Sequence, residues 1–171
     1  LGPERKSHLL SKKEKEITAY HEAGHALVAS VLPYADPVHK VSIIARGNAG
    51  GYTLKLPLED RRLQSKKEFI DDIAMSLGGY VAEQMIFGDI TTGPSSDLQM
   101  ATNLARAMVT RFGMSDVIGP IALVGAGGRP QYNEITEREY SESVSSKIDA
   151  EVSRIINDGI KSAEKVLVEH K

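Results

Sequence analysis

Cysteine is absent from this chain of 171 residues. Its absence excludes disulfide bonds, thiolate zinc clusters, iron–sulfur ligation and a cysteine nucleophile. The sequence also lacks a run of about 18 apolar residues, the length that a helix needs to cross a bilayer. We therefore expect any membrane anchor to lie outside this stretch of chain, and any metal site to use imidazole and carboxylate groups.

Neither sign of charge dominates the composition. There are 21 Lys and Arg residues against 23 Asp and Glu, a formal net charge of -2, which gives no electrostatic reason to expect a nucleic-acid partner. With 41% hydrophobic and 26% charged residues, the composition is typical of a globular protein, and the length suits one domain over residues 1–171. The first residue is Leu1 and not Met, so we expect a fragment of a longer protein.

Helix starts are marked by a Ser or Thr that is followed three positions later by Glu. This pattern is typical of a capping box, in which the two side chains bind the free amide groups of the first turn. It occurs at Ser11–Glu14, Ser65–Glu68 and Thr136–Glu139. With the apolar periodicity, it predicts four helices, over residues 11–32, 65–87, from 94–96 to 113, and from about 136 toward the C-terminal end.

A different pattern separates the first two predicted helices. Residues 38–44 and 52–56 are β-branched or alternate between apolar and polar, and the intervening residues 46–51 are rich in glycine. This pattern predicts a β-hairpin. Residues 114–135 are expected to form an irregular connection with at most one short strand, at residues 121–124. The predicted fold class is mainly α, with a small β-sheet inserted between the first two long helices.

The motif H-E-A-G-H at residues 21–25 is the strongest chemical signal. Residues four apart lie on one face of a helix, so His21 and His25 can both reach a zinc ion about 2 Å from their nitrogens. Glu22 lies beside the first of these ligands and can act as the general base that takes a proton from the attacking water. Both histidines fall in the apolar half of the helix, where unpartnered imidazoles would be costly to bury.

A zinc hydrolase needs a third protein ligand. The pattern with a third histidine six residues after the second fails, because that position is Val31. Asp97 is the best candidate, since it opens an apolar helical stripe, although an aspartate there is also typical of simple helix capping. Glu83 is the rival, either as a ligand or as a hydrogen-bond acceptor that orients a ligating histidine. The residues alone leave this choice open.

The order of motifs resembles the proteolytic domain of the FtsH family, membrane-anchored ATP-dependent zinc proteases. The resemblance spans nearly the whole chain. It is carried by residues 2–7, 17–26, 41–44, 51–53, 56–57, 77–79, 81–83, 86–88, 92–98, 101–102, 108–110, 113–115 and 119–120.

The resemblance implies that His21, His25 and Asp97 bind one Zn²⁺ per chain, that Glu22 is the catalytic base, and that Glu83 supports a ligand. It also implies unfolded polypeptides as substrates, delivered by a linked ATPase, and a homohexamer in the full-length protein. The protein would be anchored through its missing N-terminal region, with this domain on the cytoplasmic face of a bacterial inner membrane or in an organelle. ATP belongs to the missing domain, because this chain has no G-x-x-x-x-G-K-[ST] motif.

Two other functions remain open at this stage. One is a catalytically silent helical oligomerisation module, and the other is a zinc hydrolase of a non-peptide substrate. The intact set of His21, Glu22, His25 and Asp97 argues against the first, and the motifs outside the metal site argue against the second. Tyr20 and His39 are the candidates for stabilising an oxyanion, although each is more typical of a packed or surface residue.

Overall fold

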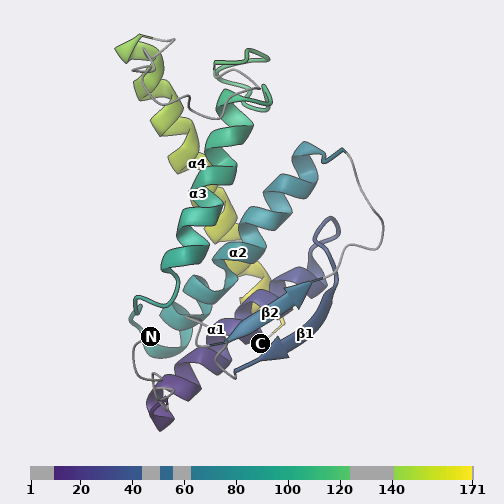
Figure 1. Cartoon of the computed structure of the whole chain (residues 1–171), viewed down its shortest axis with the longest axis vertical. Coiled ribbons are helices and arrows are strands. Elements are labelled where there is room, and N and C mark those ends of the chain that lie inside the picture. The colour runs from purple at the N-terminus through teal and green to yellow at the C-terminus, as the bar shows by residue number, and fades with distance from the viewer. Residues whose placement is uncertain (1–9, 44–50, 56–62, 124–140, 171) are drawn as a thin grey trace, which may run out of the picture.

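The computed structural model describes residues 10–43, 51–55, 63–123 and 141–170. Within these ranges the chain forms four helices and two strands (Figure 1). In chain order they are α1 (Lys12–Val31), β1 (Val38–Ser42), β2 (Tyr52–Lys55), α2 (Lys66–Phe87), α3 (Ser95–Thr110) and α4 (Glu142–Glu169). The predicted fold class, mainly α with a small sheet between the first two long helices, is confirmed.

Two of the predicted capping boxes are present. The Ser11 hydroxyl accepts a hydrogen bond from the amide of Glu14 at 3.2 Å, and the Glu14 carboxylate accepts one from the amide of Ser11 at 2.8 Å. Ser65 and Glu68 make the same reciprocal pair at the start of α2. Each box satisfies amide groups that have no partner inside the helix, which explains why a local sequence pattern located both starts correctly.

Helix α2 ends at Phe87, as predicted, with Gly88 as its C-cap, but two other helix ends differ from expectation. The third predicted capping box, at residues 136–139, lies outside the described residues; α4 itself begins at Glu142 with Ser141 as its N-cap. Helix α3 ends at Thr110 and not at residue 113. Gly113 instead adopts a left-handed conformation in the turn that follows, with φ of 61°, where a side chain would also meet the backbone of Pro120.

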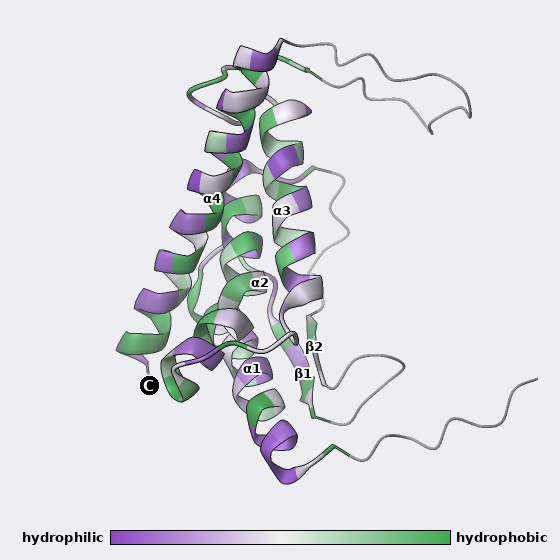
Figure 2. Cartoon of the chain, turned by 90° about the vertical axis from the view of Figure 1, so that its left-hand side faces the viewer, coloured by the Kyte–Doolittle hydropathy of each residue, from purple (hydrophilic) through white to green (hydrophobic). Residues whose placement is uncertain are grey.

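Helix α2 forms the centre of the packing. It contacts α1, α3 and α4, and Figures 1 and 2 show it between them, with hydrophobic residues along most of its length. One apolar cluster joins α2 to α3 and α4, and a second joins it to α1 and the C-terminal part of α4. In the described part of the chain, no helix is both long and apolar enough to span a membrane.

Helices α1 and α2 cross at a pair of glycines. A Cβ placed on Gly24 would meet the carbonyl oxygen of Gly78, and one placed on Gly78 would lie 2.7 Å from the carbonyl oxygen of Gly24. The two backbones therefore approach more closely than any other residue at these positions allows. This close crossing brings the histidine face of α1 against α2.

The hairpin is antiparallel, with Ser42 paired to Tyr52 and Val41 paired to Thr53. Both strands contact α1, and Figure 1 shows the sheet lying along that helix. The strand expected at residues 121–124 is not formed by residues 121–123, and residue 124 lies outside the described ranges. The Leu123 amide instead donates to the carbonyl of Thr110 at 2.8 Å, which ties this connection to the end of α3.

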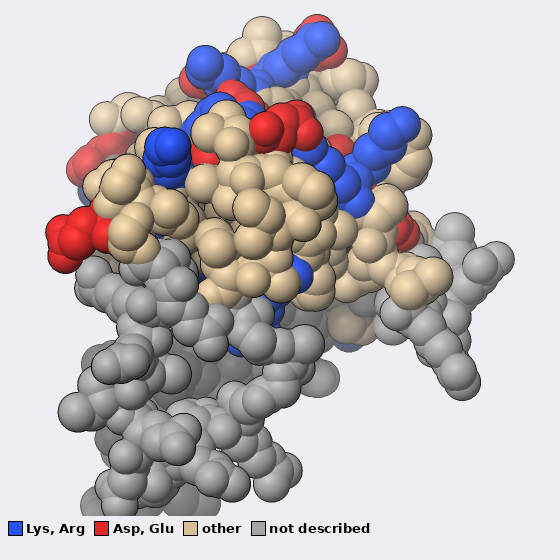
Figure 3. Space-filling view, turned by 90° about the horizontal axis from the view of Figure 1, so that it is seen from above, with Lys and Arg blue, Asp and Glu red and all other residues tan. Residues whose placement is uncertain are grey.

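The described surface carries both signs of charge. Figure 3 shows Lys and Arg side chains interspersed with Asp and Glu on the face seen from above. Among the described atoms of this face, the two signs of charge alternate.

Candidate metal centre

The two motif histidines lie side by side on the buried face of α1. His21 is 8% exposed and His25 is 6% exposed. Their rings meet edge to face with centroids 4.7 Å apart, and their Nε2 atoms are 3.0 Å apart. The spacing of four residues on a regular helix is therefore enough to bring both Nε2 atoms to one point.

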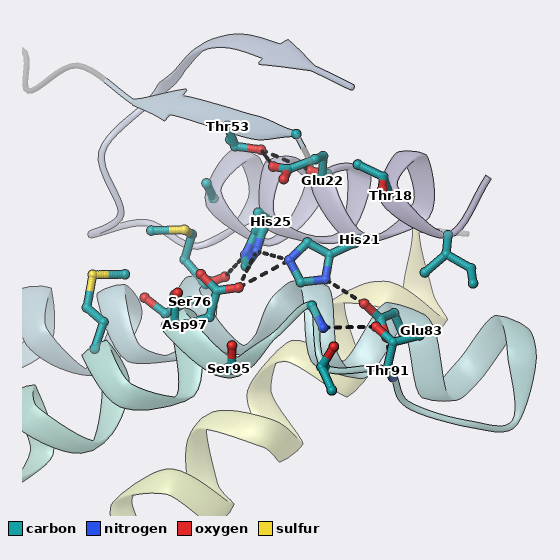
Figure 4. Close-up of a pocket in the computed structure, with 18 of the residues that line it drawn as sticks. Thr18, His21, Glu22, His25, Thr53, Ser76, Glu83, Thr91, Ser95 and Asp97 are labelled. Atoms are coloured by element: carbon teal, nitrogen blue, oxygen red, sulfur yellow. Dashed lines mark hydrogen bonds and ion pairs between the residues drawn. The ribbon is translucent and has the colours of Figure 1, made fainter. Parts of the chain in front are cut away.

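Asp97 joins this pair from the first turn of α3. Its Oδ2 atom lies 3.1 Å from Nε2 of His21 and 3.3 Å from Nε2 of His25. The N-cap of α3 is Pro94, which provides no side-chain cap, and the Asp97 carboxylate faces the histidines (Figure 4). The ligand atoms of these three residues all lie within 4.8 Å of one another, the one such cluster found among the described residues.

Glu83 occupies a different position, on the outer side of His21. One of its carboxylate oxygens lies 2.9 Å from Nδ1 of His21. The other accepts hydrogen bonds from the amide and the hydroxyl of Thr91, each at 2.9 Å. With 1% of its surface exposed, Glu83 is held between α1 and the turn that leads into α3. Glu83 therefore contacts the outer nitrogen of His21, Nδ1. It does not reach the space between the Nε2 atoms of His21 and His25.

The hydrogen bonds of the Nδ1 atoms determine the protonation of the Nε2 atoms in both histidines. Nδ1 of His25 lies 2.7 Å from the carbonyl oxygen of Met75, which can only accept a hydrogen bond. Nδ1 of His21 likewise faces a carboxylate oxygen. When both rings are neutral, each Nδ1 therefore carries the hydrogen and each Nε2 presents a bare lone pair.

Two bare nitrogens and a carboxylate oxygen about 3 Å apart repel one another unless a proton or a cation lies between them. Two imidazoles and one carboxylate are the donor types that zinc takes in catalytic sites with three protein ligands. The residues present thus fit a zinc ion, both in the kind of donor and in the direction that each donor faces.

The pKa values of Asp97 and His21 show that these side chains interact electrostatically. Burial acts to raise the pKa of Asp97, but hydrogen bonds and charge from His21 and His25 outweigh it and lower the pKa to about 2. Burial acts to lower the pKa of His21, but Asp97 and Glu83 more than offset it, so that this pKa is raised. The negative field that retains a proton on His21 also favours a divalent cation between these side chains.

Glu22 is buried beside the cluster, at 6% exposure. Its side chain points toward the hairpin, where its carboxylate accepts a hydrogen bond from the Thr53 hydroxyl at 2.7 Å (Figure 4). Glu22, Thr53 and the three clustered residues all line one open pocket of about 570 Å³ between α1, the hairpin and the start of α3. The Glu22 carboxylate and the three clustered side chains therefore face the same open pocket.

Three contributors were not foreseen from the sequence. Thr53 and the Met75 carbonyl come from segments far from the motif, and Gly79 lies against the His21 ring. The alternation of residues 52–56 predicts the strand that carries Thr53, but no pattern in the sequence specifies any of these three contacts. The proposed oxyanion donors are elsewhere: Tyr20 packs on Phe87 with centroids 5.6 Å apart, and His39 is exposed.

Comparison with known proteins decides the family. The model of peptidase family M41 matches residues 8–171. The chain belongs to peptidase family M41. This membership confirms the predicted resemblance and the predicted class of enzyme, a metallopeptidase.

Curated M41 relatives are similar along the whole of this chain. The ATP-dependent zinc metalloprotease FtsH of Veillonella parvula is 50% identical over 177 residues, which cover 100% of this chain and 27% of the relative. FtsH 1 of Sphaerobacter thermophilus is 53% identical, covering 99% and 26%, and FtsH of Bacillus subtilis is 46% identical, covering 99% and 27%. The chain thus spans about a quarter of the length of the curated relatives it matches.

Proposed function

We propose that this M41 chain is a zinc-dependent endopeptidase domain in which His21, His25 and Asp97 bind the metal and Glu22 is the general base. The observation that carries the proposal is the convergence of two Nε2 atoms and one carboxylate oxygen from two helices. The relatives, whose names describe zinc metalloproteases, support zinc as the ion.

The chemistry divides between the metal and Glu22. When bound, zinc lowers the pKa of water toward neutrality and polarises the carbonyl of a scissile peptide. The Glu22 carboxylate accepts the proton of the attacking water and then gives it to the departing amine. Glu83 and the Met75 carbonyl hold the two imidazole rings in the orientation that the ligands need. No covalent intermediate is required, which suits a chain without cysteine.

The substrate we propose is an extended polypeptide. Gly51 and Thr53 of the hairpin border the pocket, and within the described residues β2 pairs only with β1. An unfolded segment can therefore add to the sheet as a further strand, so that its backbone provides the affinity. This mode of binding requires an unfolded substrate.

The proposal extends to the complete protein. The relatives are named ATP-dependent, and this chain lacks a phosphate-binding loop motif. We therefore place ATP hydrolysis in a linked domain that unfolds substrates and delivers them. A homohexamer, anchored through a membrane segment with this domain on the cytoplasmic face, completes the proposal; both features come from the family resemblance.

The test is cleavage of a quenched fluorogenic peptide and of unfolded casein by the zinc-loaded chain. We expect cleavage by the wild type, loss of it in Glu22→Gln at equal zinc content, and no change in Glu16→Gln. Glu16 is a matched control because it is exposed on the same helix. Unchanged cleavage by Glu22→Gln would remove Glu22 as the base.

The same assay separates the two alternative functions. A wild type that binds zinc but cleaves neither substrate would support a silent oligomerisation module, and cleavage of esters without peptides would support a non-peptide hydrolase. In the complete protein, we expect degradation of a folded substrate only with ATP. Equal degradation without ATP would contradict the linked ATPase.

A further inference from the structure

The orientation of Glu22 depends on a residue outside its own helix. Glu22 follows the first histidine directly, so its side chain leaves α1 toward the flank of the metal cluster and not toward its centre. There the Thr53 hydroxyl donates to Oε2 of Glu22 at 2.7 Å. The same hydroxyl lies 3.2 Å from the main-chain oxygen of Glu22. Since a hydroxyl has one proton, the shorter contact with the carboxylate is the stronger one.

The hairpin is built to reach this carboxylate. Thr53 is set in register by its pairing with Val41, and Gly51, two positions earlier along the chain, is buried against α1. A Cβ on Gly51 would lie 3.0 Å from Cγ of Glu22 and 2.7 Å from Cγ2 of Thr18. The glycine thus lets the strand approach α1 closely enough for the Thr53 hydroxyl to meet the Glu22 side chain.

We infer that Thr53 is the positioning residue for the general base, holding one carboxylate oxygen of Glu22 so that the other is free to take the proton of the attacking water. The inference rests on the proposed function of Glu22. Thr53 does not touch the reacting atoms in this role; it acts by restricting the rotation of the Glu22 carboxylate. A carboxylate without this restraint samples orientations from which proton transfer fails, and small misplacements of this kind cost large factors in rate.

The position of Thr53 also couples substrate and base. The strand that we propose to pair with the peptide is the strand that holds Glu22. A peptide that docks on β2 therefore meets the base in a fixed place relative to its own backbone. The experiments below distinguish the positioning role of the Thr53 hydroxyl from a purely structural link between β2 and α1.

The test compares Thr53→Val, which removes the hydroxyl at nearly constant volume, with Thr53→Ser, which keeps it. We expect kcat for peptide cleavage to fall about tenfold to a hundredfold in Thr53→Val, with KM and zinc content unchanged, and to recover largely in Thr53→Ser. Thr102→Val, the same substitution on α3 outside the pocket, should match the wild type. A wild-type kcat in Thr53→Val would overturn the inference.

A second readout does not depend on turnover. A peptide hydroxamate donates a proton to the carboxylate beside the metal, so its affinity reports how well Glu22 is held. We expect Thr53→Val to weaken hydroxamate binding in the wild-type background and to have no further effect in Glu22→Gln. An equal loss in both backgrounds would mean that Thr53 acts on the fold of the site and not through Glu22, and would overturn the inference.

Two further comparisons of variants separate loss of the fold, failure of the role of Thr53 and failure of the proposed function. If Thr53→Val loses zinc or unfolds, the pair Thr53→Ser and Thr53→Ala carries the test, because the alanine differs from the serine only by the hydroxyl. Equal kcat in this pair would contradict the inference. Failure of the proposed function appears separately, as full activity in Glu22→Gln, whereas an inactive Glu22→Gln with a fully active Thr53→Val refutes the role of Thr53 alone.

Discussion

Gly79 of α2 lies directly against the imidazole ring of His21. A Cβ at position 79 would stand 2.5 Å from Nε2 and 2.6 Å from Nδ1 of that ring, closer than any real contact allows. The absence of a side chain on α2 is therefore what makes room for the first histidine of the cluster. The glycine therefore shapes the proposed metal site, although it has no side chain that could bind an ion.

This relationship predicts the effect of Gly79→Ala. Alanine favours a helix by about 1 kcal/mol over glycine, so the helix itself is not weakened, but the His21 ring must move from between Glu83 and Asp97. We expect zinc affinity to fall about tenfold or more, measured by competition with a chelator. Gln84→Ala, an exposed position on the same helix, is the control. Wild-type affinity in Gly79→Ala would show that the ring can shift at no cost.

Asp97 and Glu83 are predicted to respond differently to loss of charge. Asp97→Asn removes the negative charge of the proposed third ligand, so we expect the chain to lose stoichiometric zinc. Glu83→Gln leaves the three proposed ligands in place but provides one acceptor oxygen where His21 Nδ1 and Thr91 need two, so we expect zinc to be retained with an affinity about ten- to a hundredfold lower. Metal analysis after dialysis measures both, with Asp116→Asn, an exposed aspartate, as control. Zinc retained in Asp97→Asn and lost in Glu83→Gln would exchange the two roles.

The crossing of α1 and α2 predicts a large effect of Gly24→Ala on stability. The added methyl would meet the Gly78 backbone and lie 2.7 Å from Cβ of Ala82, and backbone cannot move aside as a flexible side chain can. We expect the free energy of unfolding to fall by about 1–3 kcal/mol, measured by urea denaturation of the metal-free chain. Ser30→Ala, on the exposed side of α1, should have a much smaller effect; equal effects would contradict this packing.

A buried carboxylate far from the metal site predicts pH-dependent stability. Glu151 on α4 is 4% exposed and is bound by Arg154 at 2.8 Å and by the Ser115 hydroxyl at 2.5 Å. The hydrogen bond from Arg154, opposed by burial and aided by Ser115, lowers the pKa of Glu151 below its ordinary 4.5. Its ionised form therefore stabilises the fold above that pH, and this stabilisation is lost as the pH falls through the lowered pKa.

The corresponding experiment is urea denaturation of wild type and Glu151→Gln between neutral and acidic pH. We expect the wild type to be more stable by about 1–2 kcal/mol near neutral pH, with the difference shrinking below pH 4.5. Glu142→Gln, near the exposed start of α4, should show no such trend. A difference that does not change with pH would mean that Glu151 contributes by packing and not by its charge.

Sequence patterns correctly predict the features that depend on contacts between residues close in the chain. The starts of α1 and α2 follow from Ser11 and Ser65, whose partners lie three residues away, and the pairing of His21 with His25 follows from the helical repeat alone. The third member could not be derived in this way. An aspartate at the position of Asp97 is also typical of helix capping. The close crossing of α1 and α2 and the turn into α3 bring it to the histidines.

Contacts between distant segments account for the rest. No periodicity indicates that Thr53 reaches Glu22 or that Gly79 lies against a ring, because each contact depends on how two elements approach in space. The end of α3 differs from the predicted residue 113 for a similar reason, because Gly113 serves a turn that packs on Pro120. The resemblance to a family provided Asp97 where the residues alone left the choice open.

The most direct test of the metal centre is anomalous diffraction from zinc-saturated crystals, recorded on both sides of the zinc absorption edge. We expect one peak per chain, about 2.0–2.2 Å from Nε2 of His21, Nε2 of His25 and a carboxylate oxygen of Asp97. A peak bonded to Glu83, a peak that Asp97 does not reach, or no peak at all would contradict the assignment of this cluster as the zinc site.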